Sequence, residues 1–143
     1  MEYKNNKGVI ALKVVVFLLF GSGVFWQCAN VGAPLGGPRD TLPPNVMRAT
    51  PDFNTVNFSG TRIYVEFDEY IQLKDQQKEF FSSPPMKKTP TLTVKGRGVQ
   101  IDIKDTLKEN TTYVLNFGST IRDNNEGNPL NGFRYVFSTG PYI

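Results

Sequence analysis

Carboxylates are the side chains of this sequence whose types and spacing suit hydrolytic chemistry. Glu66 and Asp68 stand two apart in RIYVEFD, so in a strand they share one face about 6.6 Å apart. This separation overlaps that of the two carboxyl groups in inverting glycosidases, and Glu69 adds a third acid. The same residues on a polar strand face are solvated side chains, and no apolar pocket is evident that would raise a pKa. We therefore predict no catalytic residues, with a carboxylate-based hydrolase or a carbohydrate-active accessory domain as the alternative.

A second oxygen-rich stretch occupies residues 123–128. Around Gly127 it contains Asp123, Asn124, Asn125, Glu126 and Asn128. An EF-hand calcium loop does not fit, because the glycine stands fifth from Asp123 and no bidentate glutamate follows at the required position. The alternative is an Asx-rich connection whose side chains bond their own backbone while Gly127 takes a positive φ. We predict this connection and no metal site.

Composition excludes several classes of chemistry. Histidine is absent and Cys28 is the single cysteine, which removes Ser/His and Cys/His catalysis, histidine general bases and ordinary zinc sites. Three lysines and one glutamate precede Cys28, so 13 of the 16 basic and 12 of the 13 acidic residues follow it. This near balance gives no reason to expect a nucleic-acid partner. We predict a protein that is not an enzyme and needs no cofactor.

The residues before Cys28 have the features of an export signal. A basic leader contains Lys4, Lys7 and Lys13, and the thirteen residues 14–26 carry no charge. A basic front followed by an apolar core of about 7–15 residues is typical of a secretory signal. An uncleaved membrane-anchoring helix is the alternative, although thirteen residues extend only about 20 Å against a hydrocarbon layer of about 30 Å. We predict a signal peptide over residues 1–27.

The position of Cys28 resembles the lipobox of bacterial lipoproteins, in which the thiol receives a diacylglycerol and becomes the first mature residue. The flank reads Phe25, Trp26, Gln27, whereas the family has an aliphatic residue and two small ones. The resemblance implies a lipid anchor on Cys28, which holds a protein on a bilayer durably when two or three acyl chains are present. The alternative is a free or buried thiol. Ala29 is not the acidic residue that retains lipoproteins in the inner membrane, which favours the outer membrane, facing the periplasm.

From Val46 onward the sequence follows the period of two that β-strands require. Apolar and polar residues alternate at residues 62–68, 91–95, 99–105, 112–118 and 133–138. Weaker strand candidates are residues 46–49, 56–58 and 79–82, with one helical turn at 74–78. About seven short strands with turn signals between them predict an all-β, antiparallel β-sandwich over residues 45–140. Residues 28–44 are rich in glycine and proline and predict a flexible tether.

Several segments together carry a family resemblance. LKENTTYVLNF at 107–117 places Tyr113 at the start of a strand after a polar turn, which looks like the structural tyrosine corner of Ig-type sandwiches. The other segments are PPNVMRATP at 43–51, IYVEFDEYI at 63–71, RDNNEGNPL at 122–130 and FRYVFSTG at 133–140. The chain resembles bacterial Ig-like domains of the S-layer-protein (SbsA) type at the N-terminus of Gram-negative lipoproteins. This resemblance implies a non-catalytic binding or spacer module of the cell envelope.

The stretch from Asp68 to Pro85 is the longest without regular alternation, and loops of this kind often carry function. Tyr70, Phe80 and Phe81 within it form a possible partner-binding loop, to which Phe53 can contribute. The alternative is that these aromatic side chains cover the ends of the sandwich core. Besides the membrane, we expect an envelope protein or a glycan as the partner.

Overall fold

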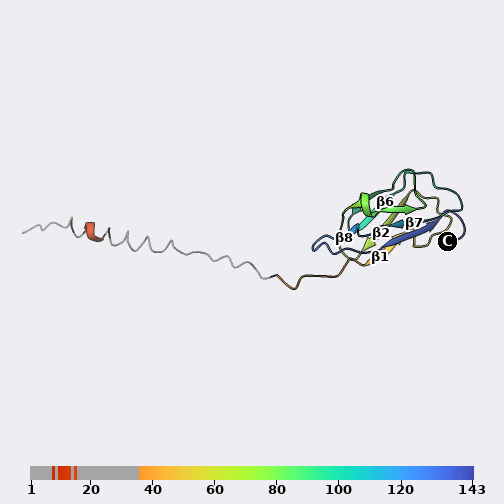
Figure 1. The fold of residues 1–143 in the computed structure, drawn as a ribbon. Helices are drawn as coiled ribbons and strands as arrows, with labels where there is room; N and C mark the ends of the chain where they lie inside the picture. The colour runs from red at the N-terminus through yellow and green to blue at the C-terminus, as the bar shows by residue number, and fades with distance from the viewer. Residues whose placement is uncertain (1–7, 9, 14, 16–35) are drawn as a thin grey trace, which may run out of the picture. The chain divides into compact units, whose positions relative to one another are not determined.

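A computed structural model describes residues 8, 10–13, 15 and 36–143 (Figure 1). The chain divides into two units, residues 1–37 and 38–143. In the first unit, residues 8, 10–13 and 15 are helical. Cys28, most of the predicted signal peptide and residues 29–35 of the predicted tether lie outside the described residues. Within the described ranges, no helix has both the length and the apolar character needed to span a membrane.

Residues 38–143 form a β-sandwich. Its elements are β1 (Val46–Thr50), β2 (Arg62–Phe67), β3 (Ile71–Leu73), α2 (Gln76–Glu79), β4 (Phe81–Ser83), β5 (Thr91–Lys95), β6 (Gly98–Asp102), β7 (Thr112–Asn116), β8 (Ile121–Asp123) and β9 (Arg134–Ser138). The strands pair antiparallel in a sheet of order β1-β2-β6-β5, a sheet of order β4-β7-β9 and the small pair β3-β8. The prediction of an all-β, Ig-like antiparallel sandwich is confirmed (Figure 1).

The apolar side chains at every second strand position fill the core between the two larger sheets. In β2, Ile63, Val65 and Phe67 are fully buried, while the residues between them reach the opposite face. The inward positions of the other strands are Val99, Ile101, Tyr113, Leu115, Tyr135 and Phe137, all buried. Each buried large side chain stabilises the fold by about 1.5–3 kcal/mol before entropy is counted. This burial explains why a domain of this size holds together without a disulfide.

The edges of the sandwich differ from the sequence prediction. Within residues 68–85, α2 and β4 lie close to the predicted helical turn at 74–78 and the weak strand candidate at 79–82. The strand β3 was not predicted, and it pairs with β8, while β4 pairs with β7. Residues 56–58 form no strand, although Asn54 N–H and Phe58 N–H donate to carbonyls of β9 and cover its edge. Val94 points inward in register with Val99 but stays 39% exposed, because β5 is an edge strand.

The last residues of the predicted tether contact the domain. Arg39 donates a hydrogen bond from Nη2 to the Glu126 carbonyl at 3.2 Å. Asn128 donates from Nδ2 to the carbonyls of Asp40 and Leu42, each at 3.2 Å. These bonds hold residues 39–42 against the domain several residues before β1.

Candidate binding surface

The two carboxylates with hydrolase-like spacing are already engaged. Glu66 forms an ion pair with Arg48 of the neighbouring strand β1. Asp68 follows β2 and accepts hydrogen bonds from Asn45 N–H at 2.9 Å and Asn45 Nδ2 at 3.0 Å. The Asn45 side chain lowers the pKa of Asp68 from its ordinary value, the opposite of the shift that a general acid needs.

The pKa of Glu69, the third acid of this stretch, is raised from its ordinary value. Burial is the main cause, followed by the negative charge of Asp123. Asp123 itself is bound by backbone groups of its own loop. Within the described residues no cluster of acidic, cysteine or histidine side chains is arranged to hold a metal ion. Of these two acids, Asp123 thus has a structural role in its own loop.

The oxygen-rich stretch at residues 123–128 is the Asx-rich connection that its composition predicts. The buried Asp123 carboxylate accepts hydrogen bonds from the backbone N–H groups of Glu126 at 2.6 Å, Gly127 at 2.8 Å and Asn128 at 2.9 Å. Gly127 has φ of +82°, a backbone conformation that favours glycine. Burial raises the pKa of Asp123, but the three N–H donors outweigh it and the pKa is lowered. The structure thus contains the predicted Asx-rich connection, with Gly127 at positive φ.

The aromatic residues proposed as a partner-binding loop do not share one surface. Tyr70 and Phe81 are 65% and 54% exposed. Phe80 is buried and its ring lies 5.0 Å from that of Phe117, so it belongs to the core and is not available to a partner. The reason is that Phe80 follows α2 directly and turns inward where β4 begins. Phe53 packs its ring against Tyr135 at 5.5 Å and covers an end of the core.

Tyr113 has the environment that a tyrosine corner requires. Its ring is buried and stacks on Phe137 with centroids 5.4 Å apart. Its hydroxyl oxygen accepts a hydrogen bond from Lys108 N–H at 2.9 Å, five residues upstream. Thr139 fixes the same turn, because its Oγ1 donates to the Lys108 carbonyl at 2.7 Å. These bonds tie the turn before β7 to the end of β9.

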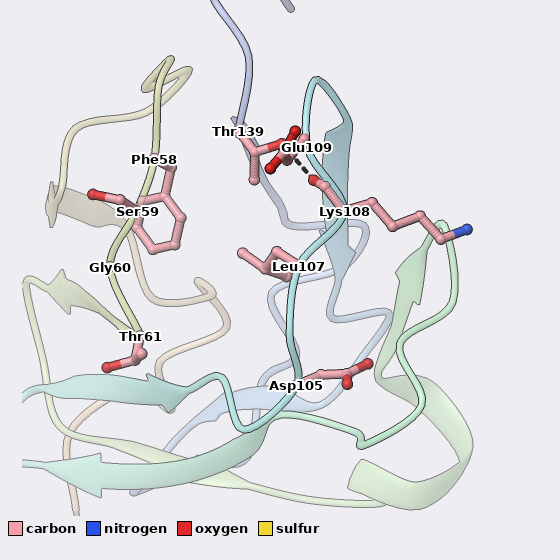
Figure 2. A pocket seen from close by; sticks show the side chains of 9 residues that line it. All are labelled: Phe58, Ser59, Gly60, Thr61, Asp105, Leu107, Lys108, Glu109 and Thr139. Atoms are coloured by element: carbon pink, nitrogen blue, oxygen red, sulfur yellow. Dashed lines mark hydrogen bonds between the residues drawn. The ribbon is translucent and has the colours of Figure 1, made fainter.

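A hollow of about 310 Å³ opens beside this turn, between residues 58–61 and 105–109 (Figure 2). The side chains of Phe58 and Leu107 point into the gap, and Lys108 points away from it. Asp105 at one end is occupied by backbone, since its carboxylate accepts hydrogen bonds from Lys87 N–H and Thr106 N–H. Glu109, Ser59 and Thr61 also line the hollow, so its wall combines polar side chains with Phe58 and Leu107 at the margin of the core.

The outer face of the β1-β2-β6-β5 sheet carries a different arrangement, which the sequence pattern did not reveal. Tyr64 of β2 lies across β6, and its hydroxyl donates to the Lys95 carbonyl of β5 at 3.0 Å. The ring rests on Gly98, where an added Cβ would approach the Tyr64 Oη to 2.5 Å and Cζ to 2.6 Å. The missing side chain at position 98 thus leaves the space that the end of the Tyr64 ring occupies.

Hydrogen-bonded polar side chains surround this ring. Glu66, opposite Gly98, pairs with Arg48, and Arg62 pairs with Asp102 at 2.9 Å. Gln100, opposite Tyr64, donates from Nε2 to both Asp102 carboxylate oxygens at 3.1 and 2.9 Å. We refer to this set as the Tyr64 face. Its members are Arg48, Arg62, Tyr64, Glu66, Gln100 and Asp102.

A hollow of about 380 Å³ borders the Tyr64 face at the β5-β6 hairpin. It is lined by Met47, Arg48, Glu66, Phe67, Asp68 and Arg97. Met47 is 66% exposed where a bulge interrupts β1, so it adds an apolar wall to an otherwise charged rim. Arg97 donates from Nη1 to the Asp68 carbonyl at 3.1 Å and holds the hairpin against the end of β2.

Comparison with known proteins agrees with the sheet arrangement, which is that of an Ig-like β-sandwich. Residues 40–139 match the family of bacterial Ig-like domains, and the chain belongs to this family. Among solved structures it is similar to PcoC, a methionine-rich copper resistance protein from Escherichia coli. The identity is 14%, the match covers 67% of this chain and 97% of PcoC, and the TM-score is 0.48. No curated protein matches.

Proposed function

We propose that this chain is an exported, lipid-anchored Ig-like module of the SbsA type that binds or spaces components of the cell envelope without catalysing a reaction. The observation that carries the proposal is the order of segments along the chain. A basic and apolar leader ends at Cys28, a Gly/Pro-rich tether follows, and a domain of the bacterial Ig-like family begins at residue 40.

The acids of the domain support a role in binding over one in hydrolysis. Glu66 and Asp68 are paired with Arg48 and Asn45, and the pKa of Asp68 is lowered. A glycosidase needs one carboxyl group with a raised pKa opposite a second one that faces the substrate. The pKa of Glu69 is raised, but the carboxylates nearest to it in the sequence are engaged by Arg48 and Asn45. The domain presents paired polar side chains on a sheet face, an arrangement that suits recognition.

Acylation of Cys28 is tested by substitution. We expect Cys28→Ala to release the protein from the membrane fraction or to leave an uncleaved precursor, because the thiol that carries the acyl chains is gone. Fractionation and labelling with a radioactive or clickable fatty acid measure both effects. The free-thiol alternative predicts equal membrane attachment and no label in either protein.

The predicted outer-membrane location is tested on the same cells. Separation of inner and outer membranes on a density gradient, followed by protease treatment of intact cells, reports both the membrane and its exposed side. We expect the wild type in the outer-membrane fraction and protected from protease. Recovery in the inner-membrane fraction would contradict the sorting that Ala29 predicts.

A further inference from the structure

We infer that the Tyr64 face is a binding site for a neutral glycan of the cell envelope. This inference deepens the proposed function by naming a class of partner and the surface that receives it. It rests on that proposal for the location of the ligand, and on the geometry of the β1-β2-β6-β5 sheet for its chemistry.

The ring of Tyr64 provides the platform. The ring lies over Gly98 and its hydroxyl is held by the Lys95 carbonyl, so the ring is fixed in place over β6. The residue is half-buried, which agrees with a ring covered on one side. Sugar rings present C–H groups on one face, and aromatic rings with a negative π face attract such positively polarised groups. An aromatic ring that is held in place and partly exposed therefore suits a pyranose.

The groups beside the ring are ordered before any ligand arrives. Arg62 and Gln100 both bond Asp102, and Arg48 bonds Glu66. Planar carboxylate, amide and guanidinium groups recognise neighbouring hydroxyls in pairs, and ordering them in advance lowers the entropic cost of binding. The carboxylates keep further lone pairs for hydroxyl donors, since each oxygen accepts more than one hydrogen bond.

The charge of the face favours a neutral ligand over a charged one. Each of the two ion pairs beside Tyr64 joins one positive and one negative side chain, so the pairs add no net charge to the face. A polyanion or an anionic lipid surface is bound by clustered basic side chains, which the alternating signs of this face do not form. A neutral polyhydroxyl chain needs donors and acceptors of both kinds, and the face offers them.

The hollow at the β5-β6 hairpin extends the site along a chain-like ligand. Its volume of about 380 Å³ falls in the range of small-ligand clefts, about 300–1,000 Å³. It shares Glu66 and Arg48 with the Tyr64 face, so one sugar stacked on Tyr64 places its neighbour over the hollow. There the exposed Met47 adds apolar contact.

The test measures binding of the full chain in detergent micelles to printed neutral hexose and N-acetylhexosamine oligosaccharides and to purified peptidoglycan sacculi. We expect Tyr64→Ala to weaken binding about tenfold, which corresponds to about 1.4 kcal/mol. Tyr64→Phe keeps the ring and should stay within about threefold of wild type. Glu66→Gln preserves the size of the side chain and should weaken binding about fivefold.

Tyr142→Ala is the matched control, because this tyrosine is 81% exposed near the C-terminus and lies outside the site. Thermal unfolding of every variant verifies that each one folds. Equal losses for Tyr142→Ala and Tyr64→Ala would overturn the inference, as would steep weakening of binding with salt, which indicates an anionic ligand.

Membrane fractionation of the same variants separates this inference from the proposed function. If the wild type is membrane-attached and captures an envelope protein through Tyr64 but binds no printed glycan or sacculus, the glycan inference fails and the binding module stands. If the wild type binds glycans but remains soluble and unacylated, the lipid anchor fails and the glycan site stands.

Discussion

Asp123 shows how one buried carboxylate can organise a loop. Its carboxylate accepts hydrogen bonds from the backbone N–H groups of residues 126–128, which are half-buried. Hydrogen bonds to a charged acceptor contribute about 1.5–3 kcal/mol each, and a buried donor left without a partner costs about 1–3 kcal/mol. The loop between β8 and β9 is therefore held chiefly by this residue.

We predict that Asp123→Ala lowers the free energy of unfolding by about 2–3 kcal/mol, because it strands these donors. Urea titration at neutral pH measures the loss. Asn124→Ala, an exposed change in the same loop, is the control and should stay within about 0.5 kcal/mol of wild type.

The lowered pKa of Asp123 also predicts a pH dependence. A carboxyl group with a pKa below its unfolded value of about 3.9 stabilises the fold above that pH, and the contribution disappears as the pH falls through the folded pKa. Asp123→Asn should therefore lose less stability than wild type when the pH is lowered below about 4. Parallel acid losses in both proteins would argue against this role.

The raised pKa of Tyr135 predicts that the fold loses stability as the pH rises, the opposite of the dependence that Asp123 produces. Burial raises its pKa to about 12, and its hydroxyl donates to the Pro51 carbonyl at 2.8 Å. The unfolded chain loses this proton near pH 10, so the stabilisation is complete below about pH 10 and is lost up to about pH 12. In urea titrations across this range, Tyr135→Phe should show a shallower decline than wild type, whereas Tyr142→Phe should follow wild type.

At the scale of elements, the packing of Tyr64 on Gly98 joins β2, β6 and β5. A methyl group at position 98 would collide with the Val65 carbonyl and the Tyr64 ring. We predict that Gly98→Ala costs about 2–3 kcal/mol, because backbone or ring must shift. Gly96→Ala is the control: its Cβ meets open space, so only the strain of φ +58°, about 1 kcal/mol, applies. Thermal and urea unfolding distinguish the two, and equal costs would show that crowding at position 98 is not the cause.

Alternation predicted the strands of the core because each of them buries one face. Ile63, Val65 and Phe67 produce a clear pattern, and so do Tyr113 and Leu115. The strands β3 and β8 were missed, since three residues give too few alternations to recognise and their pairing is set by distant contacts. Residues 56–58 were predicted as a weak strand because Val56 and Phe58 alternate, but they form none. Three residues carry too little alternation to distinguish a strand from a loop.

The Tyr64 face could not be predicted from the sequence, because it depends on the register between β2 and β6. Along β2, Tyr64 appears as one more outward residue, and Gly98 appears as the end of a turn. Only the antiparallel register places Gly98 diagonally across from Tyr64 and beside Glu66. By contrast, the composition of the 123–128 loop was sufficient, because its bonds are local. The buried position of Phe80 likewise depends on Phe117, far along the chain.

At the scale of the whole molecule, residues 39–45 are held against the domain by hydrogen bonds before β1 begins. We predict that Asn128→Ala accelerates trypsin cleavage after Arg39 several-fold, because the Asp40 and Leu42 carbonyls lose their donor. Asn124→Ala is again the matched control. Timed digestion with mass spectrometry measures the rates, and indistinguishable rates would mean that these bonds do not protect the segment.

These contacts also determine the order in which hydrogen bonds break when the chain is pulled from its N-terminal side. A pull from the N-terminal side first reaches the bond of Arg39 to the Glu126 carbonyl and then the bonds of Asn128 to Asp40 and Leu42. The bonds of Asp68 to Asn45 follow, and only then the ladder between β1 and β2. A few side-chain bonds break under less force than a sheet ladder. The segment before β1 would therefore lengthen by about 3.3–3.6 Å per released residue while the sandwich remains intact. The domain could thus move a short distance under load before any strand separates.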